Sequence, residues 1–417
     1  MSILLLAALS WSPIQASLAS HTIDTPAYIE QLPEIRRGVI ASFEEIGSAS
    51  RNEIAQQLAE QKIPGIPEHG VTLYRVVYYT VNVDGTEITA SGAVAIPDGH
   101  EGPAPLLSYQ HGTVSARHRV PSQEGLDLIS MGLGGSGYVT ALPDYIGLGE
   151  SDTFHPYVHA KSLGTAVVDL LRATRQLCNE LSIDLNDQLF LVGYSEGGFA
   201  TMAAHRELEL HYADEFTVTA SAPMAGPYSL SEVMVDQMLD HKKYPSPGYL
   251  PYTLLSYDRV YGLFDELSTV FKEPYASRVD GFFDGIKTLQ YINTQLPNVP
   301  LEMLTKDFVA ALREDSHPLR DVLAENDVHN WAPVAPMRLF HCVDDDQVSF
   351  RNAEVALKAF QEQGATHVEL AALEFGDHEK CAPPALFLGK LWLDEFKEDK
   401  APSLLQANIK IIRASAF

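Results

Sequence analysis

Cysteine is scarce in this chain, with three residues among 417, and so few exclude a fold built on several disulfides. Basic residues are also few, since 29 Lys and Arg stand against 55 Asp and Glu. The resulting formal net charge of −26 repels nucleic acid and anionic membrane surfaces, so neither is expected as a partner.

Signatures of membrane spans and cofactor sites are missing as well. No apolar run reaches the roughly 18 residues that a membrane-spanning helix requires. The glycine-rich stretch at 134–137 precedes a strand pattern and has no lysine after it, which argues against a phosphate loop. The fifteen histidines show no spacing typical of metal ligands. We therefore expect no transmembrane span, no metal and no other cofactor.

The N-terminal segment differs in composition from the rest of the chain. Ile3 to Leu9 form a short apolar run, and small residues follow up to a candidate cleavage point after Ala19. This pattern is typical of a secretory signal peptide, although no Lys or Arg precedes the apolar run. We expect residues 1–19 to be a signal peptide and the protein to be secreted or periplasmic. A disordered N-terminal tail is the alternative.

Strand and helix patterns alternate along most of the chain. Two strand patterns, 71–83 and 88–96, flank Asp84-Gly85, which is a strong hairpin signal. Residues 25–70 are expected to form helices and loops. Further strands are expected at 105–109, 138–142, 189–194, 218–222, 338–343 and 367–373, and helices at 158–181, 199–211, 353–360 and 384–396. This alternation predicts an α/β fold with a mostly parallel sheet covered by helices on both faces.

One apolar strand pattern ends abruptly at a serine between glycines, Gly193-Tyr194-Ser195-Glu196-Gly197. A helical pattern follows at once, so Ser195 is expected at the apex of a tight turn, a nucleophile elbow. Strand and helix pass so closely at such a turn that only glycine fits at 193 and 197. The backbone N–H of Glu196 would then begin a helix and could face an oxyanion.

A serine hydroxyl becomes a nucleophile when a base takes its proton and a carboxylate orients that base. His378 is the expected base, because it follows a late strand pattern and Gly376 beside it leaves room for approach. Asp345 is the preferred acid within 344–346, because Val348 would pack at the start of the next helix and turn Asp345 inward. The other histidines considered lie before the late loops or on helices and strands, where a packed or solvated side chain is the default.

A second oxyanion donor is expected in the loop after the strand at 105–109. This loop reads His111-Gly112-Thr113, and glycine lets backbone N–H groups turn toward a carbonyl oxygen. Which of the three N–H groups would donate is left open, and an ordinary tight turn is the alternative.

Two of the three cysteines lie beside the expected acid and base. Cys342 and Cys381 are each three residues from one of Asp345 and His378. If the acid and the base meet, these cysteines come close enough to form a disulfide in an oxidising compartment.

The alternation is interrupted between residues 226 and 336. This stretch has no clear strand pattern, but it is rich in aromatic residues and has helical spacing at 230–239 and 301–312. A structureless loop of such length is rare in a compact domain, so we expect a helical insertion. It starts at the carboxyl end of the strand that follows Ser195, which favours a cap over the site, although such aromatics also suit a plain core. The expected core comprises residues 20–225 and 337–417.

Together these motifs resemble the α/β-hydrolase superfamily and, within it, the secretory lipase family of esterases and lipases. The resemblance rests on residues 109–113, 144–149, 193–198 and 341–348 and on Asp377-His378. It implies the α/β-hydrolase fold with a helical cap. It also implies an exported serine hydrolase that cleaves small ester or lipid substrates through an acyl-enzyme. A serine peptidase on the same fold is the alternative, and a non-catalytic binding protein is a third hypothesis.

Overall fold

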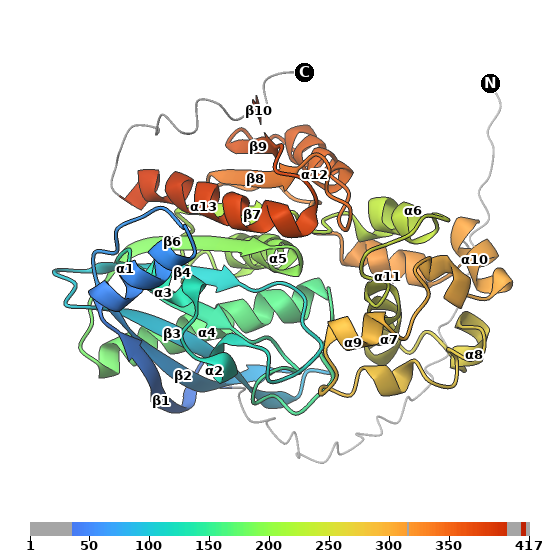
Figure 1. Ribbon diagram of the computed structural model, residues 1–417, viewed down its shortest axis with the longest axis horizontal. Coiled ribbons are helices and arrows are strands. Elements are labelled where there is room, and N and C mark those ends of the chain that lie inside the picture. Colours follow the sequence, from blue (N-terminus) through green and yellow to red (C-terminus); the bar gives the residue numbers. More distant parts are fainter. Residues whose placement is uncertain (1–35, 315–316, 398–409, 414–417) are drawn as a thin grey trace, which may run out of the picture. The chain divides into compact units, whose positions relative to one another are not determined.

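A computed structural model describes residues 36–314, 317–397 and 410–413, so the expected signal peptide lies outside the described residues. Within them, the chain forms a ten-stranded sheet in the order β1-β2-β3-β5-β4-β6-β7-β8-β9-β10 (Figure 1). The strands from β5 to β9 in this order are parallel, as the strand and helix alternation predicts.

The first three strands form an antiparallel meander, β1 (Ile40–Ala49), β2 (Gly70–Val81) and β3 (Glu87–Asp98). The hairpin between β2 and β3, with its turn at Asp84-Gly85, is confirmed. The expectation of helices and loops throughout 25–70 is wrong for β1, although α1 (Arg51–Glu60) does follow it. Most side chains of β1 are exposed, because it pairs with β2 alone at the sheet edge, and its sequence therefore lacks an apolar alternation.

The strands from β4 to β9 match the expected ones within a few residues, but β10 lies where no strand is expected. β3 is antiparallel to β5, and β10 is antiparallel to β9. The remaining strands are β4 (Ala104–Gln110), β5 (Val139–Pro143), β6 (Leu185–Tyr194), β7 (Ala220–Met224), β8 (Met337–Cys342), β9 (Val368–Leu373) and β10 (Lys410–Arg413).

Helices cover both faces of this sheet. Along β6, Leu189 and Leu191 pack with α4 and α5, whereas Phe190 and Val192 pack with α13 on the opposite face. Alternate residues of a strand point to opposite faces, so a strand buried on both sides is continuously apolar. The helices outside 226–336 that follow α1 are α2 (Pro121–Glu124), α3 (Leu128–Gly134), α4 (Ala160–Glu180), α5 (Glu196–His211), α12 (Arg351–Glu362) and α13 (His378–Lys397).

Residues 226–336 consist of short helices joined by loops, which Figure 1 shows in yellow to orange at the right of the view. The helix expected at 301–312 is broken, because Leu304 forms a β-bridge with Phe271 and Thr305 caps the following helix. The elements are η1 (Leu230–Met234, a π-helix), α6 (Val235–Met238), α7 (Tyr249–Tyr261), α8 (Leu267–Val270), η2 (Asp280–Phe282), α9 (Leu289–Asn293), η3 (Pro300–Met303), α10 (Lys306–Arg313) and α11 (Leu319–Glu325).

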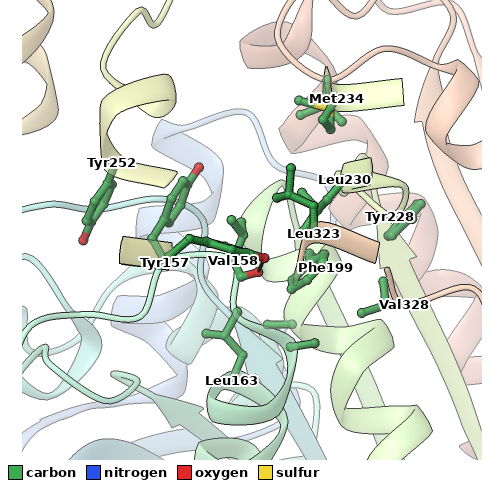
Figure 2. Close-up of a cluster of buried hydrophobic side chains, with 14 of the residues drawn as sticks. Tyr157, Val158, Leu163, Phe199, Tyr228, Leu230, Met234, Tyr252, Leu323 and Val328 are labelled. Carbon is green, nitrogen blue, oxygen red and sulfur yellow. Dashed lines mark hydrogen bonds between the residues drawn. The ribbon is translucent and has the colours of Figure 1, made fainter. Parts of the chain in front are cut away.

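This helical segment shares a hydrophobic core with the helices that cover the sheet. Leu163 of α4 and Phe199 of α5 belong to one buried cluster with Leu230, Tyr252 and Leu323 (Figure 2). Phe199 lies one turn into the helix that begins at the serine turn. The helical segment is therefore packed directly beside the end of the sheet where the candidate site lies.

Candidate active site

The turn between β6 and α5 holds Ser195 in a strained backbone conformation, with φ 63° and ψ −125°. Positive φ is unfavourable for a residue with a side chain, and such strain is typical of functional turns. A Cβ added to Gly193 would lie 2.4 Å from the carbonyl oxygen of Gly197, and one added to Gly197 would lie 2.0 Å from that of Gln110. The prediction that only glycine fits at both positions is confirmed.

The three side chains expected to act together meet at the carboxyl ends of β6, β8 and β9. The Nε2 atom of His378 lies 2.9 Å from Ser195 Oγ, and its Nδ1 atom lies 2.7 Å from Asp345 Oδ2. Ser195 and His378 are only 8% and 3% exposed. A histidine in this position can accept the serine proton while the carboxylate stabilises the imidazolium that forms.

Asp345 is held by groups on its own loop. Its Oδ1 atom accepts the N–H groups of Gln347 and Val348 at 3.0 and 2.8 Å, and Val348 is buried as expected. His341 Nε2, 3.3 Å from Asp345 Oδ2, is a second neighbour that sequence reasoning missed. Burial alone would raise the pKa of Asp345, but hydrogen bonds from His341 and His378 lower it well below its ordinary value. Asp345 therefore stays ionised beside the base.

The loop of His378 is anchored by further contacts. Asp344 and Asp346 are both exposed, yet Asp346 Oδ1 also accepts the backbone N–H of His378 at 3.2 Å. The hydroxyl of Tyr194 donates to the His378 carbonyl at 2.7 Å. Since Tyr194 directly precedes Ser195, this bond ties the two loops together at the point where His378 and Ser195 meet.

The loop after β4 borders the serine, where a second oxyanion donor is expected. A Cβ added to Gly112 would lie 3.8 Å from the Cβ of Ser195. The carbonyl of His111 accepts the Tyr145 hydroxyl at 2.9 Å, and Thr113 Oγ1 lies 3.0 Å from the Tyr157 hydroxyl. Because Glu196 is the first residue of α5, its N–H has no partner within the helix. The N–H of Glu196 and the loop of residues 111–113 thus both lie beside Ser195.

A buried pair next to the serine is a feature that sequence reasoning missed. His155 Nε2 lies 2.9 Å from Glu196 Oε1, and its Nδ1 lies 2.7 Å from the carbonyl oxygen of Ile146. A carbonyl only accepts, so Nδ1 of His155 donates to Ile146 and Nε2 faces the Glu196 carboxyl group. Among the described residues, Glu196 Oε2 has no hydrogen-bond partner. No regular spacing connects positions 155 and 196; the only hint was a glutamate in an otherwise apolar turn.

The loop that carries His155 begins with a structural turn. Asp144 is fully buried and accepts the Ser91 hydroxyl at 2.6 Å and the backbone N–H of Ser122 at 3.1 Å. Burial raises its pKa, although these hydrogen bonds act in the opposite direction. Gly147 and Gly149 adopt positive φ values of 83° and 59°. These contacts and glycine conformations fix the turn that leads to His155.

A disulfide joins Cys342, the last residue of β8, to Cys381 in the first turn of α13, with a Cα–Cα distance of 6.1 Å. It therefore links the loop of Asp345 to that of His378. Cys178 is buried and unpaired. In the part of the chain that the structure describes, no three His, Cys, Asp or Glu side chains are grouped so that they could hold a metal ion. None of the described helices is both long and apolar enough to cross a membrane.

The chain matches the family model of the secretory lipases over residues 119–395. Among solved structures, the ligand-bound rice cell wall degrading esterase LipA from Xanthomonas oryzae is 31% identical, with a TM-score of 0.77 over 85% of this chain and 95% of that one. A hydrolase from Legionella pneumophila is 28% identical, with a TM-score of 0.81 over 87% of this chain and 100% of that one.

Candida antarctica lipase A in its closed state is only 16% identical, but has a TM-score of 0.68 over 89% of this chain and 84% of that one, which is a likeness of fold. Among curated proteins, a search finds no match to this chain. The match over residues 119–395 spans more than half of the chain, and the structural neighbours confirm the α/β-hydrolase fold. The protein is thus a carboxylic-ester hydrolase and belongs to the secretory lipase family.

Proposed function

We propose that this protein is an exported serine esterase that works through an acyl-enzyme. The observation that carries the proposal is the unbroken hydrogen-bonded series from Asp345 Oδ2 through the His378 imidazole to Ser195 Oγ, with spacings of 2.7 and 2.9 Å. A hydroxyl aligned in this way on a strained turn is activated for attack by the adjacent base.

In the first half of the reaction, Ser195 Oγ forms a bond to the ester carbonyl carbon while its proton passes to His378 Nε2. The charge that develops on the carbonyl oxygen is stabilised by the N–H of Glu196 and by the loop of residues 111–113. When the bond between the carbonyl carbon and the alcohol oxygen breaks, His378 returns the proton to the leaving alcohol. Water then repeats these steps and releases the acid.

The buried surroundings strengthen these electrostatic effects. Asp345 stays ionised, so it stabilises the positive charge on His378 when the proton arrives. The contact with His155 fixes the side chain of Glu196, whose backbone N–H is the proposed oxyanion donor.

Labelling with a fluorophosphonate probe and turnover of p-nitrophenyl acetate test the serine mechanism. Ser195→Ala should abolish labelling and lower kcat by about 10⁴-fold or more. Ser277→Ala is the matched control, because Ser277 is exposed and belongs to the helical segment. If Ser195→Ala were labelled as strongly as the wild type, the mechanism would be wrong.

Export is supported by the composition of residues 1–19 and by the Cys342–Cys381 disulfide, because disulfides persist in oxidising compartments. Expression of the full chain and of a chain without residues 2–19, followed by cell fractionation, tests the proposal. The full chain should appear outside the cytoplasm with two oxidised cysteines by mass spectrometry. Retention of both chains in the cytoplasm would contradict export and leave the esterase assignment untouched.

A further inference from the structure

Two spaces of different character open onto Ser195. The first is a narrow, partly enclosed cavity of about 40 Å³ between Ser195 and the helical segment. Apart from Ser195 and Glu196, its walls are mainly apolar and aromatic, with contributions from Leu230, Met234 and Met238. This cavity is the space between the serine and the helices η1 and α6.

The second space is an open cleft of about 350 Å³ on the other side of the serine. His378 and residues 111–113 form its floor, and its rim carries Arg119, Glu124 and Asp127. Arg119 and Glu124 form a salt bridge of 2.8 Å with both side chains largely exposed. The rim therefore offers hydrogen-bond donors and acceptors to a bound group in contact with solvent.

The position of the base decides which part of the ester enters which space. The leaving alcohol oxygen must come within hydrogen-bond distance of His378 Nε2 to receive its proton. His378 lines the wider cleft and is absent from the walls of the narrow cavity. The alcohol part of the ester therefore lies in the cleft, and the acyl part points into the cavity.

The cavity limits the length of the acyl group. A water-sized group requires about 10–15 Å³ measured in this way, so 40 Å³ accommodates about three such groups, or an acyl chain of about two to four carbons. The wall at η1 is anchored from outside, since Asp327 Oδ1 accepts the N–H groups of Leu230 at 2.6 Å and Ser231 at 3.1 Å. A longer chain would have to displace this buried, hydrogen-bonded wall.

Other residues of the cavity wall are tied to the loop that carries Asp345. The backbone carbonyl of Gln347 accepts from Gln237 at 2.9 Å and from the Tyr244 hydroxyl at 2.7 Å. The Tyr249 hydroxyl lies 3.1 Å from Gln347 Oε1, and the N–H of Gln347 donates to Asp345. Moving this wall outward would disturb the residue that orients the base, so the small volume is part of the catalytic arrangement.

From these observations we propose that the enzyme prefers esters of short acyl groups with hydrophilic alcohols. The acyl group of about two to four carbons occupies the narrow cavity, and a polyhydroxylated alcohol lies in the wider cleft. This inference rests on the proposed serine mechanism, because that mechanism assigns the alcohol to the side of His378.

Turnover of p-nitrophenyl acetate, butyrate and octanoate by the full enzyme tests the acyl half. We expect kcat/KM for octanoate to be about 100-fold below that for acetate or butyrate, because a chain that overfills the narrow cavity must displace its packed wall. Met234→Ala should raise the octanoate-to-acetate ratio about tenfold. Met238→Ala, which truncates a half-buried side chain of the same wall, should do the same with less effect on folding.

Leu210→Ala is the matched control, because Leu210 is an exposed leucine on α5 outside the cavity, and its ratio should equal that of the wild type. Equal turnover of octanoate and acetate by the wild type would overturn the proposal. Loss of all turnover in Ser195→Ala would still support the serine mechanism in that case, so the two failures are distinguishable.

Sorbitol monoacetate and hexyl acetate, whose alcohols have the same number of carbons, test the alcohol half. We expect kcat/KM for the sorbitol ester to be about tenfold higher or more, because the rim of the cleft can hydrogen-bond hydroxyl groups. A preference for hexyl acetate would contradict a hydrophilic alcohol site.

Discussion

The carboxyl ends of the parallel strands and the helical segment of residues 226–336 both border Ser195, but they make different contributions. At the carboxyl ends of β6, β8 and β9, the chain places Ser195, Asp345 and His378 through backbone geometry, buried hydrogen bonds and a disulfide. The helical segment contributes apolar and aromatic side chains that close one side of the serine. Substitutions at the carboxyl ends of these strands should therefore alter kcat, whereas substitutions in the helical segment should alter substrate preference or stability.

The largest effect on kcat is expected from a substitution of Asp345, which follows the carboxyl end of β8. Asp345→Asn keeps the size of the side chain but removes the charge that stabilises the imidazolium of His378. We expect kcat toward p-nitrophenyl acetate to fall by about 10³ to 10⁴-fold, with little change in KM. Steady-state kinetics measures both constants.

Asp344→Asn is the control for this change, because Asp344 is the exposed neighbour in the same loop and should keep nearly full activity. A fall in activity of the same size in both variants would mean that the loop, and not the charge of Asp345, supports catalysis.

A smaller effect is expected from the link between the two loops. Cys342 and Cys381 close a loop with a sequence separation of 39, and removing the cross-link from a loop of this length costs about 3 to 4 kcal/mol of stability in the chain-entropy account. The double variant Cys342→Ser and Cys381→Ser should lose about that free energy of unfolding, measured with urea.

Reductant provides the control for the disulfide. It should destabilise the wild type toward the level of the double variant and leave the double variant unchanged. Suppose that reductant breaks the bond but leaves the wild-type free energy of unfolding unchanged. The disulfide would then contribute nothing to stability.

The contact between the sheet-covering helices and the helical segment should make stability depend on pH. His159 is buried before α4 and packs against Tyr261 of α7, with ring centroids 5.9 Å apart. Burial lowers its pKa from 6.5 to about 4, so between these values the unfolded chain binds a proton that the folded chain does not. Stability should therefore fall as pH drops through this window, by up to about 3 kcal/mol once the pH is below 4.

His159→Asn removes the titrating group and keeps a side chain suited to the helix N-terminus, so urea unfolding should depend less on pH between 6.5 and 4. His118→Asn, at an exposed position, should leave the wild-type pH dependence in place. If His159→Asn and the wild type lost equal stability on acidification, a group other than His159 would cause the pH dependence.

Local sequence patterns alone predict much of this arrangement. Ser195 is predictable because a tight turn leaves room only for glycine at 193 and 197, within five residues of chain. Asp345 is predictable because an apolar residue three positions later, Val348, packs inward and turns the loop with it. The edge strand β1 escaped prediction, since its exposed residues carry no apolar alternation. The helix expected at 301–312 was broken by Leu304, which pairs with a distant residue, Phe271.

Short-range sterics and apolar periodicity are enough to predict the strained turn at Ser195, the chain order of Ser195, Asp345 and His378, and the position of the helical insertion. The pairing of His155 with Glu196, the approach of His341 to Asp345 and the volume of about 40 Å³ beside the serine follow from tertiary packing alone. Such pairings and volumes depend on how side chains from distant parts of the chain pack together, and no local pattern records that packing.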